Sequence, residues 1–148
     1  MPDDLVNAAR PAASSPDVQT RMSRLGQRDT KPEVLLRQAL HRRGLRFRLQ
    51  RRTDFDRRRR IDIVFPREKV AIFVDGCFWH RCPRHATVPR ANAEFWDAKL
   101  SRNVERDRDT DERLGELGWT VLRFWEHEQP EVAAQRIELV VRELRGGR

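Results

Sequence analysis

The sequence lacks the features that mark secreted and membrane proteins. Its 148 residues include only two cysteines. No apolar run approaches the roughly 20 residues that cross a bilayer, and residues 1–17 lack the hydrophobic stretch of a secretory signal. We therefore expect a cytoplasmic protein without membrane contact, in which closely spaced cysteines are read as metal ligands before they are read as a disulfide.

Acidic residues are also in the minority, which points to the kind of partner. The chain has 31 Lys and Arg against 23 Asp and Glu, a net charge of +8. Nearly all of the positive charge is arginine, whose guanidinium group binds phosphate oxygens in pairs. A polyanion such as nucleic acid is the expected partner, and the length suits one domain.

The pattern along the chain predicts an α/β domain over residues 18–148 after a flexible tail at residues 1–17. Thr30 and Glu33 have the spacing of a capping box, so a helix is expected from there to Gly44. Alternating and continuous apolar residues predict three strands, and helical spacing returns after a polar loop. The expected order is α, β, β, β, α, β, α, with later elements at 47–49, 61–65, 70–74, 95–118, 119–124 (a buried strand) and from 130 onward.

A carboxylate in an apolar strand is the first candidate for chemistry. Asp62 lies between two isoleucines, where an ionised group is costly unless it is paired or bound to a metal. Simple antiparallel pairing sets Asp62 opposite Phe73 and makes Asp75 its diagonal neighbour, near enough for both to bind one Mg²⁺. Glu33 could be a third ligand. Alternatively, nearby arginines pair with Asp62, and Glu33 only completes its capping box.

The cysteines and histidines suggest a second metal site. Two thiolates and two imidazoles would make a closed zinc shell of the structural type, which would fix the polar loop at 75–91. The alternative is two free cysteines and surface histidines. His80, in the same loop, could act as a general base for water, whereas His41 is expected at the surface. The zinc ligands would be Cys77, Cys82, His85 and His127.

Arginines and aromatics supply candidates for nucleic-acid contacts. Six arginines fall within residues 51–60, next to the strand that holds Asp62. They would either contact phosphates or form a solvated loop. Phe78 and Trp79 are adjacent in a polar loop and could stack on bases, but the residues alone leave their placement open and favour core packing for Trp96.

Several segments in order resemble the very short patch repair (Vsr) endonucleases. The likeness spans about residues 20–145. It rests on Gln27–Thr30, Asp75–His80, Cys82–Pro83, Glu94–Trp96, Asn103–Asp107, Leu117–Trp119 and Trp125–His127.

The resemblance implies a restriction-endonuclease-like (PD-(D/E)XK-type) core, a mixed β-sheet flanked by helices, with a structural zinc site. It also implies Mg²⁺-dependent nicking of duplex DNA on the 5′ side of the T in a T·G mismatch that arises from deamination of 5-methylcytosine. The protein would be a bacterial monomer, associated with the nucleoid when bound to DNA, and would work near general mismatch-repair proteins and cytosine methyltransferases. The alternatives are a restriction-like nuclease without mismatch preference and a non-catalytic zinc-containing DNA-binding module. The sequence context of the mismatch is not predicted.

The resemblance also implies roles for individual residues. Asp62 becomes the central Mg²⁺ ligand, helped by the main-chain carbonyl of Val74, while His80 activates the water and Glu33 supports the metal. Where the family can have a Thr-His pair, this chain has Val74 and Asp75, and we expect Asp75 to bind the metal too. The implied zinc ligands are the same four residues, with His127 where a cysteine can stand. The implied DNA contacts are Phe78, Trp79 and Trp96, which intercalate beside the mismatch, Met22 and Leu25 on an N-terminal helix at 18–28, and a backbone clamp of Arg57, Arg58, Arg59 and Arg60.

Overall fold

The computed structural model describes residues 30–84 and 90–147. The tail and N-terminal helix that we expect, with Met22 and Leu25, lie outside these ranges, as does His85. Within them, no helix is both long and apolar enough to cross a membrane.

The observed element order confirms the predicted one. The elements are α2 (Lys31–Arg42), β1 (Arg48–Arg52), β2 (Arg60–Phe65), β3 (Val70–Asp75), α3 (Ala93–Glu116), β4 (Thr120–Trp125) and α4 (Pro130–Gly146). The four strands form one sheet in the order β1-β2-β3-β4. The first three are antiparallel neighbours and β4 runs parallel to β3, so the sheet is mixed, as expected.

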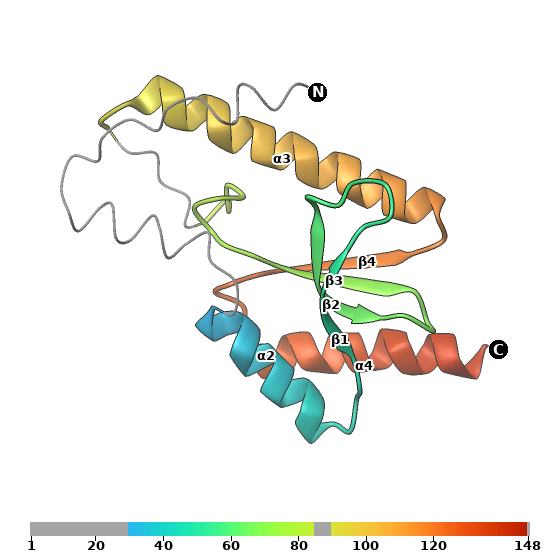
Figure 1. The fold of residues 1–148 in the computed structure, drawn as a ribbon. Helices are drawn as coiled ribbons and strands as arrows, with labels where there is room; N and C mark the ends of the chain where they lie inside the picture. Colours follow the sequence, from blue (N-terminus) through green and yellow to red (C-terminus); the bar gives the residue numbers. More distant parts are fainter. Residues whose placement is uncertain (1–29, 85–89, 148) are drawn as a thin grey trace.

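Helices cover both faces of this sheet (Figure 1). The larger core joins α2 and α4 to one face, through residues such as Leu40, Ile72 and Ile137. A smaller core packs Leu114 of α3 against the other face, beside Phe73. The molecule therefore has three layers, and the face under α3 keeps fewer apolar contacts.

Two glycines end helices in the same way and so fix where the next strand begins. Gly44 has φ +75° and Gly118 has φ +85°, a conformation that glycine adopts without strain. After α2, the Leu45 N–H donates to the Leu40 carbonyl at 3.1 Å, and after α3 the Trp119 N–H donates to the Leu114 carbonyl at 2.9 Å. The first helix thus ends two residues before Gly44, slightly earlier than expected.

Two details of the sequence-based prediction were wrong. The capping box is absent, because no side-chain hydrogen bond caps Thr30 in the described structure and Glu33 is buried instead. In β4 only Leu122 and Phe124 are buried, because the strand lies at the edge of the sheet and its other residues face α3 or solvent. As a result, two polar side chains, Glu33 of α2 and Arg123 of β4, lie toward the same end of the sheet, where β3 ends.

Candidate active site

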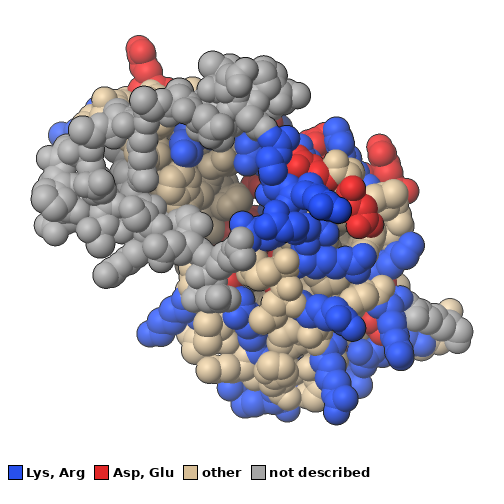
Figure 2. Space-filling view, viewed as in Figure 1, with Lys and Arg blue, Asp and Glu red and all other residues tan. Residues whose placement is uncertain are grey.

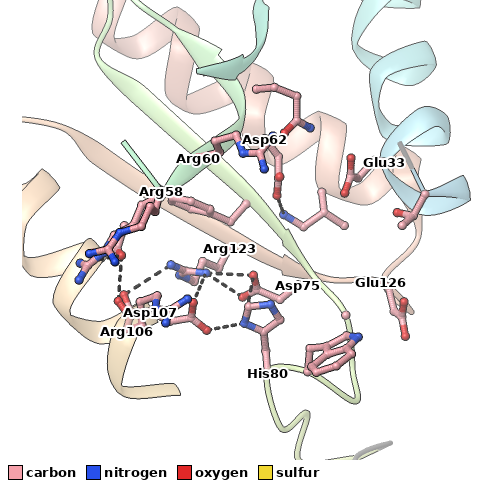
Figure 3. A pocket seen from close by; sticks show the side chains of 18 residues that line it. Glu33, Arg58, Arg60, Asp62, Asp75, His80, Arg106, Asp107, Arg123 and Glu126 are labelled. Atoms are coloured by element: carbon pink, nitrogen blue, oxygen red, sulfur yellow. Dashed lines mark hydrogen bonds and ion pairs between the residues drawn. The ribbon is translucent and has the colours of Figure 1, made fainter. Parts of the chain in front are cut away.

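A cavity of about 280 Å³ opens where β3 ends, between the sheet and α3 (Figure 3). All four predicted catalytic side chains line it, together with three residues of the arginine run and side chains from β1, α3 and β4. Its lining includes Glu33, Gln50, Arg58, Arg59, Arg60, Asp62, Val74, Asp75, Trp79, His80, Arg106, Asp107 and Arg123. The fold thus brings residues that are almost 100 positions apart into one site.

Asp62 lies in β2 with the predicted register. Phe65 pairs with Val70 across the turn, so counting back sets Asp62 opposite Phe73. Its Oδ2 accepts the Val74 N–H at 2.8 Å. In residues 30–84 and 90–147 no arginine forms an ion pair with it, which removes the alternative interpretation of a carboxylate neutralised by neighbouring arginines. Burial, and next the negative charge of Glu33, raise the pKa of Asp62 to about 7.

Glu33 enters the cavity from α2. It is 6% exposed, and Nη2 of Arg37 lies 3.3 Å from its Oε2. Because its charge raises the pKa of Asp62, the two carboxylates are electrostatically coupled. Two coupled carboxylates, one buried and one half-buried, are a typical environment for a divalent cation.

Asp75 has a partner that the sequence did not suggest. Nη1 of Arg123, on β4, donates to both of its oxygens at 2.9 and 3.1 Å. Arg123 also pairs with Asp111 at 2.8 Å and lies 4.1 Å from the centre of the Phe73 ring. Burial raises the pKa of Asp75, although His80 and Arg123 oppose the shift. Magnesium binding by Asp75 therefore stays a prediction, and any such ion would share this carboxylate with a guanidinium group.

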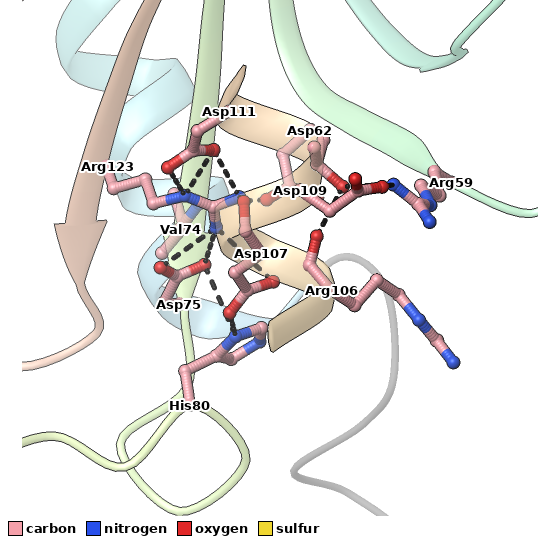
Figure 4. A network of polar contacts seen from close by, with 11 residues as sticks. Arg59, Asp62, Val74, Asp75, His80, Arg106, Asp107, Asp109, Asp111 and Arg123 are labelled. Atoms are coloured by element: carbon pink, nitrogen blue, oxygen red, sulfur yellow. Dashed lines mark hydrogen bonds and ion pairs between the residues drawn. The ribbon is translucent and has the colours of Figure 1, made fainter. Parts of the chain in front are cut away.

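His80 is held by a second acidic residue from α3. Its Nδ1 contacts Oδ2 of Asp107 and lies 3.8 Å from Oδ1 of Asp75 (Figure 4). Burial alone would lower the pKa of His80, but these two carboxylates outweigh it and raise the pKa. Because Nδ1 faces a carboxylate it carries the hydrogen, which leaves Nε2 as the nitrogen that can accept a proton. One atom each of Asp75, His80 and Asp107 lie within 4.8 Å of one another.

Asp107 and Arg123 are the site residues that our sequence analysis missed. Asp107 was noted only as part of a family segment. On α3, however, Asn103, Asp107 and Asp111 are spaced by four residues and so share one helix face. That spacing is the signal by which the sequence indicates a shared polar face, and the structure shows that the face points inward, because Asn103 donates to the Trp79 carbonyl at 3.2 Å.

Three of the four candidate zinc ligands, Cys77, Cys82 and His127, also meet, at the ends of β3 and β4. The parallel pairing of Asp75 with Trp125 sets the two following segments side by side. Nδ1 of His127 lies 3.3 Å from Sγ of Cys77 and 3.7 Å from Sγ of Cys82. Both cysteines are unbridged and buried. Two sulfurs and an imidazole nitrogen this close are a donor set that suits zinc.

The Cys77 thiol is protonated when no cation is present. Burial, and next the contact with Cys82, raise the pKa of Cys77 to about 12. The Cys77 N–H donates to Oε1 of Glu126 at 3.1 Å, which ties the loop to the segment after β4. A bound divalent metal would be needed to hold the thiolate form.

The aromatic candidates form a cluster instead of an exposed surface. Phe78 is 8% exposed and Trp96 is 5% exposed; both pack with Leu100, and Trp79 and Phe95 lie against them. The ring centres of Phe78 and Trp96 are 5.6 Å apart. Core packing of Trp96, which the residues alone favoured, is confirmed. The polar loop contributes Phe78 and Trp79 to this packing. Intercalation by Phe78, Trp79 and Trp96 stays a prediction.

The arginines proposed as a backbone clamp differ in their partners. Arg58 and Arg59 pair with Asp56, and Arg59 also contacts Asp109 on α3. Arg60 lines the cavity next to Asp62 (Figure 3), and Arg57 is exposed. Figure 2 shows Lys and Arg side chains gathered over β1 and the loop that leads to β2, beside the hollow. The rim of the site is therefore basic and its floor acidic.

Comparison with known proteins agrees with this arrangement. Residues 15–85 match the family model for the DNA mismatch endonuclease Vsr. The chain is 45% identical over 124 residues to the type II nicking enzyme V.NaeI of Lentzea aerocolonigenes, which covers 80% of this chain and 72% of that protein. It is 39% identical over 123 residues to the type II nicking enzyme V.NmeDIP of Neisseria meningitidis serogroup C, with 79% and 80% covered. It is 42% identical over 106 residues to the DNA mismatch endonuclease Vsr of Escherichia coli strain K12, with 71% and 66% covered.

Proposed function

Because this chain belongs to the Vsr family of DNA endonucleases, we propose that it nicks duplex DNA by hydrolysis on the 5′ side of the T in a T·G mismatch. The observation that carries the proposal is that His80, held by Asp107, and the half-buried Asp62 face one cavity with a basic rim. A base for water, a carboxylate for metal and cations for phosphate are the parts that phosphodiester hydrolysis requires.

The metal at this site is proposed to be Mg²⁺. Asp62 would hold it, with the Val74 carbonyl, Glu33 and Asp75 as the further predicted contributors, because hard oxygen ligands suit this ion. The raised pKa of Asp62 fits that role, since a nearby cation would favour the ionised carboxylate. When bound, Mg²⁺ would stabilise the negative charge that develops on the phosphate.

His80 is the proposed general base. Asp107 fixes the ring through Nδ1, so Nε2 can take the proton from a water molecule as that water attacks phosphorus. The bond from phosphorus to the 3′-oxygen then breaks, which leaves a 3′-hydroxyl and a 5′-phosphate. Asp107 acts here as a positioning residue, which holds the imidazole without touching the reacting atoms.

The Cys77, Cys82 and His127 cluster is proposed as a structural zinc site. Two thiolates and an imidazole supply three of the four ligands that such sites have, and His85, outside the described residues, is the proposed fourth. The proposed ion would fasten both ends of the loop that carries His80, and so would position the base.

DNA contact is proposed for the arginine rim, from Arg57 to Arg60, and for the aromatic cluster. Phe78 and Trp96 are buried, so their proposed contact with bases requires the cluster to open. General mismatch-repair proteins as partners, a monomeric state and the cytoplasmic, nucleoid-associated location remain predictions from the resemblance.

The deciding experiment compares nicking of three duplexes that differ in one base pair, T·G, C·G and T·A, in Mg²⁺. We expect the T·G duplex to be nicked at least about 100-fold faster, because a mismatched pair costs less to unstack and distort. The 5′-phosphate product would be identified by ligation. Nicking without preference for the mismatch would contradict the proposal.

Sequence-specific nicking of matched DNA is the second candidate, since several relatives are named type II nicking enzymes. A library of matched duplexes with randomised sequence separates the two. Preferential cleavage of one matched sequence, at a rate equal to that of its T·G counterpart, would favour this candidate. A non-catalytic DNA-binding module is set aside, because the family is one of endonucleases.

A further inference from the structure

The backbone of β1 is distorted at one residue, directly across from Asp62. Gln50 has φ +53°, a conformation that side chains other than those of glycine, asparagine and aspartate rarely adopt. Leu49 pairs with Ile63 and Arg51 pairs with Ile61, but the pair between them, Gln50 with Asp62, is missing. The ladder therefore opens at the one position where the neighbouring strand carries the central carboxylate.

The side chain of Gln50 lines the cavity, and it ends in a buried donor that has no partner. Nε2 of Gln50 is buried and makes no hydrogen bond with any described residue. Nη1 of Arg60, two residues before Asp62, is also buried and makes no hydrogen bond with any described residue. Buried donors without partners are rare and costly. Two of them, next to a strained backbone, indicate a site that is completed by a ligand.

The chemistry of this place selects the ligand. A metal cation needs acceptors, and an amide N–H and a guanidinium N–H are donors. The oxygens of a phosphodiester are acceptors and carry a negative charge, so they suit both groups. Arg58 and Arg59 pair with Asp56 through Nε and keep further N–H groups for phosphates at the rim. Gln50 and Arg60 supply the buried N–H groups without a partner next to Asp62.

From these observations we infer that Gln50 is a phosphate-binding residue. Its side-chain amide, together with Arg60, donates to a non-bridging oxygen of the phosphodiester that lies at Asp62. The inference rests on the proposed nuclease function and adds a contact to it. The strained backbone leaves Asp62 without a pair in β1, while the Gln50 side chain lines the cavity.

Gln50→Gly is the informative variant, because glycine accepts φ +53° without strain. It should fold at least as stably as the wild-type protein, while the single-turnover nicking rate falls about 100-fold, as happens when one donor to a developing oxyanion is lost. The Kd for DNA, measured in Ca²⁺, should change less than about threefold, since many phosphate contacts share the binding energy.

A matched control exists in the turn between β2 and β3. Lys69 also has a positive φ, +54°, but it is not part of the cavity lining. Lys69→Gly should therefore match Gln50→Gly in stability and keep the wild-type rate. Gln50→Glu, which keeps the shape but replaces the donor by a carboxylate, should be at least as slow as Gln50→Gly. An active Gln50→Glu variant would mean that the side chain binds the metal instead, and would overturn the inference.

Stereochemistry tests the contact itself. Each non-bridging oxygen of the nicked linkage is replaced by sulfur in turn, and the rate loss is measured for wild type and Gln50→Gly in Mg²⁺ and in Mn²⁺. For one stereoisomer we expect the sulfur to lower the nicking rate of the wild type, and we expect Mn²⁺ not to restore that rate. In Gln50→Gly the same sulfur should cause no further loss of rate.

Equal losses in both proteins for both stereoisomers would overturn the inference, as would a Gln50→Gly variant that nicks within threefold of the wild-type rate. A wild-type protein that nicks no duplex would overturn the proposed function and this contact with it. An active wild type together with an unaffected Gln50→Gly would overturn the contact alone.

Discussion

Replacement of Asp62 by Asn should make the metal-free protein more stable and abolish its nuclease activity. The carboxylate is half-buried beside Glu33 and receives one hydrogen bond, from the Val74 N–H. Asparagine has the same shape, and its carbonyl oxygen can keep that hydrogen bond. It removes only the charge that burial and Glu33 oppose.

The pKa shift sets the size of the effect. A pKa raised from 3.8 to about 7 corresponds to about 4 kcal/mol of unfolding free energy, at about 1.36 kcal/mol per unit. The folded-state pKa is the higher one, so the folded protein binds more protons between pH 3.8 and about 7. Wild-type stability therefore falls as the pH rises through that window, and the advantage of Asp62→Asn grows in parallel.

Urea unfolding without added Mg²⁺, at several pH values between about 4 and 8.5, measures this difference. We expect it to be small at the acidic end and about 2 to 4 kcal/mol above pH 7, with a part lost to relaxation of the site. Added Mg²⁺ should then stabilise the wild type and leave the variant unchanged, and nicking by the variant should fall at least about 100-fold. A difference that is independent of pH, or a variant less stable than the wild type at pH 8, would refute the reasoning.

Three other substitutions test the rest of the site. Asp107→Asn should lower kcat for nicking by about 10- to 100-fold with little change in DNA affinity. It should also move the acid limb of the kcat/KM pH profile to lower pH, because Asp107 raises the pKa of His80. An acid limb that does not move would contradict this role. Arg123→Met should lower the free energy of unfolding by about 3 to 5 kcal/mol, because the buried Asp75 loses its partner; a loss under about 1 kcal/mol in urea unfolding would show that the pair contributes little. Cys77→Ser should reduce zinc, measured by mass spectrometry, well below one per chain and lower the Tm by about 5 °C or more; full zinc content would exclude Cys77 as a ligand.

The sequence predicted the elements and the pairing of the strands that carry Asp62 and Asp75 because both are local. Apolar periodicity set the order of helices and strands, and the short turn after Phe65 set the register that places Asp62 opposite Phe73. The meeting of His127 with the two cysteines also agrees with the predicted metal cluster.

What the sequence did not predict depends on how distant elements face one another. Asp107 and Arg123 meet Asp75 and His80 because α3 is turned with one polar face toward the strand ends. Spacing along a helix shows which residues share a face, but not which distant residues that face meets. For Glu33 the residues alone left two roles open, a third metal ligand or a residue that only completes a capping box, because the capping-box spacing was right. The competing role, a buried position beside Asp62, becomes visible only after α2 has packed on the sheet.

The parallel pairing of β3 with β4 limits which changes of length the chain can accept. Arg123 pairs with Phe73 in the sheet, so its side chain lies on the same face as Asp75 and reaches that carboxylate. Side chains alternate between the two faces of a strand, and a shift of one residue moves each of them to the other face. Deletion of a single residue between Gly118 and Arg123 would turn the guanidinium group into the apolar core under α4 and put Phe124 in its place. This segment should therefore tolerate substitutions of its half-buried residues much better than insertions or deletions.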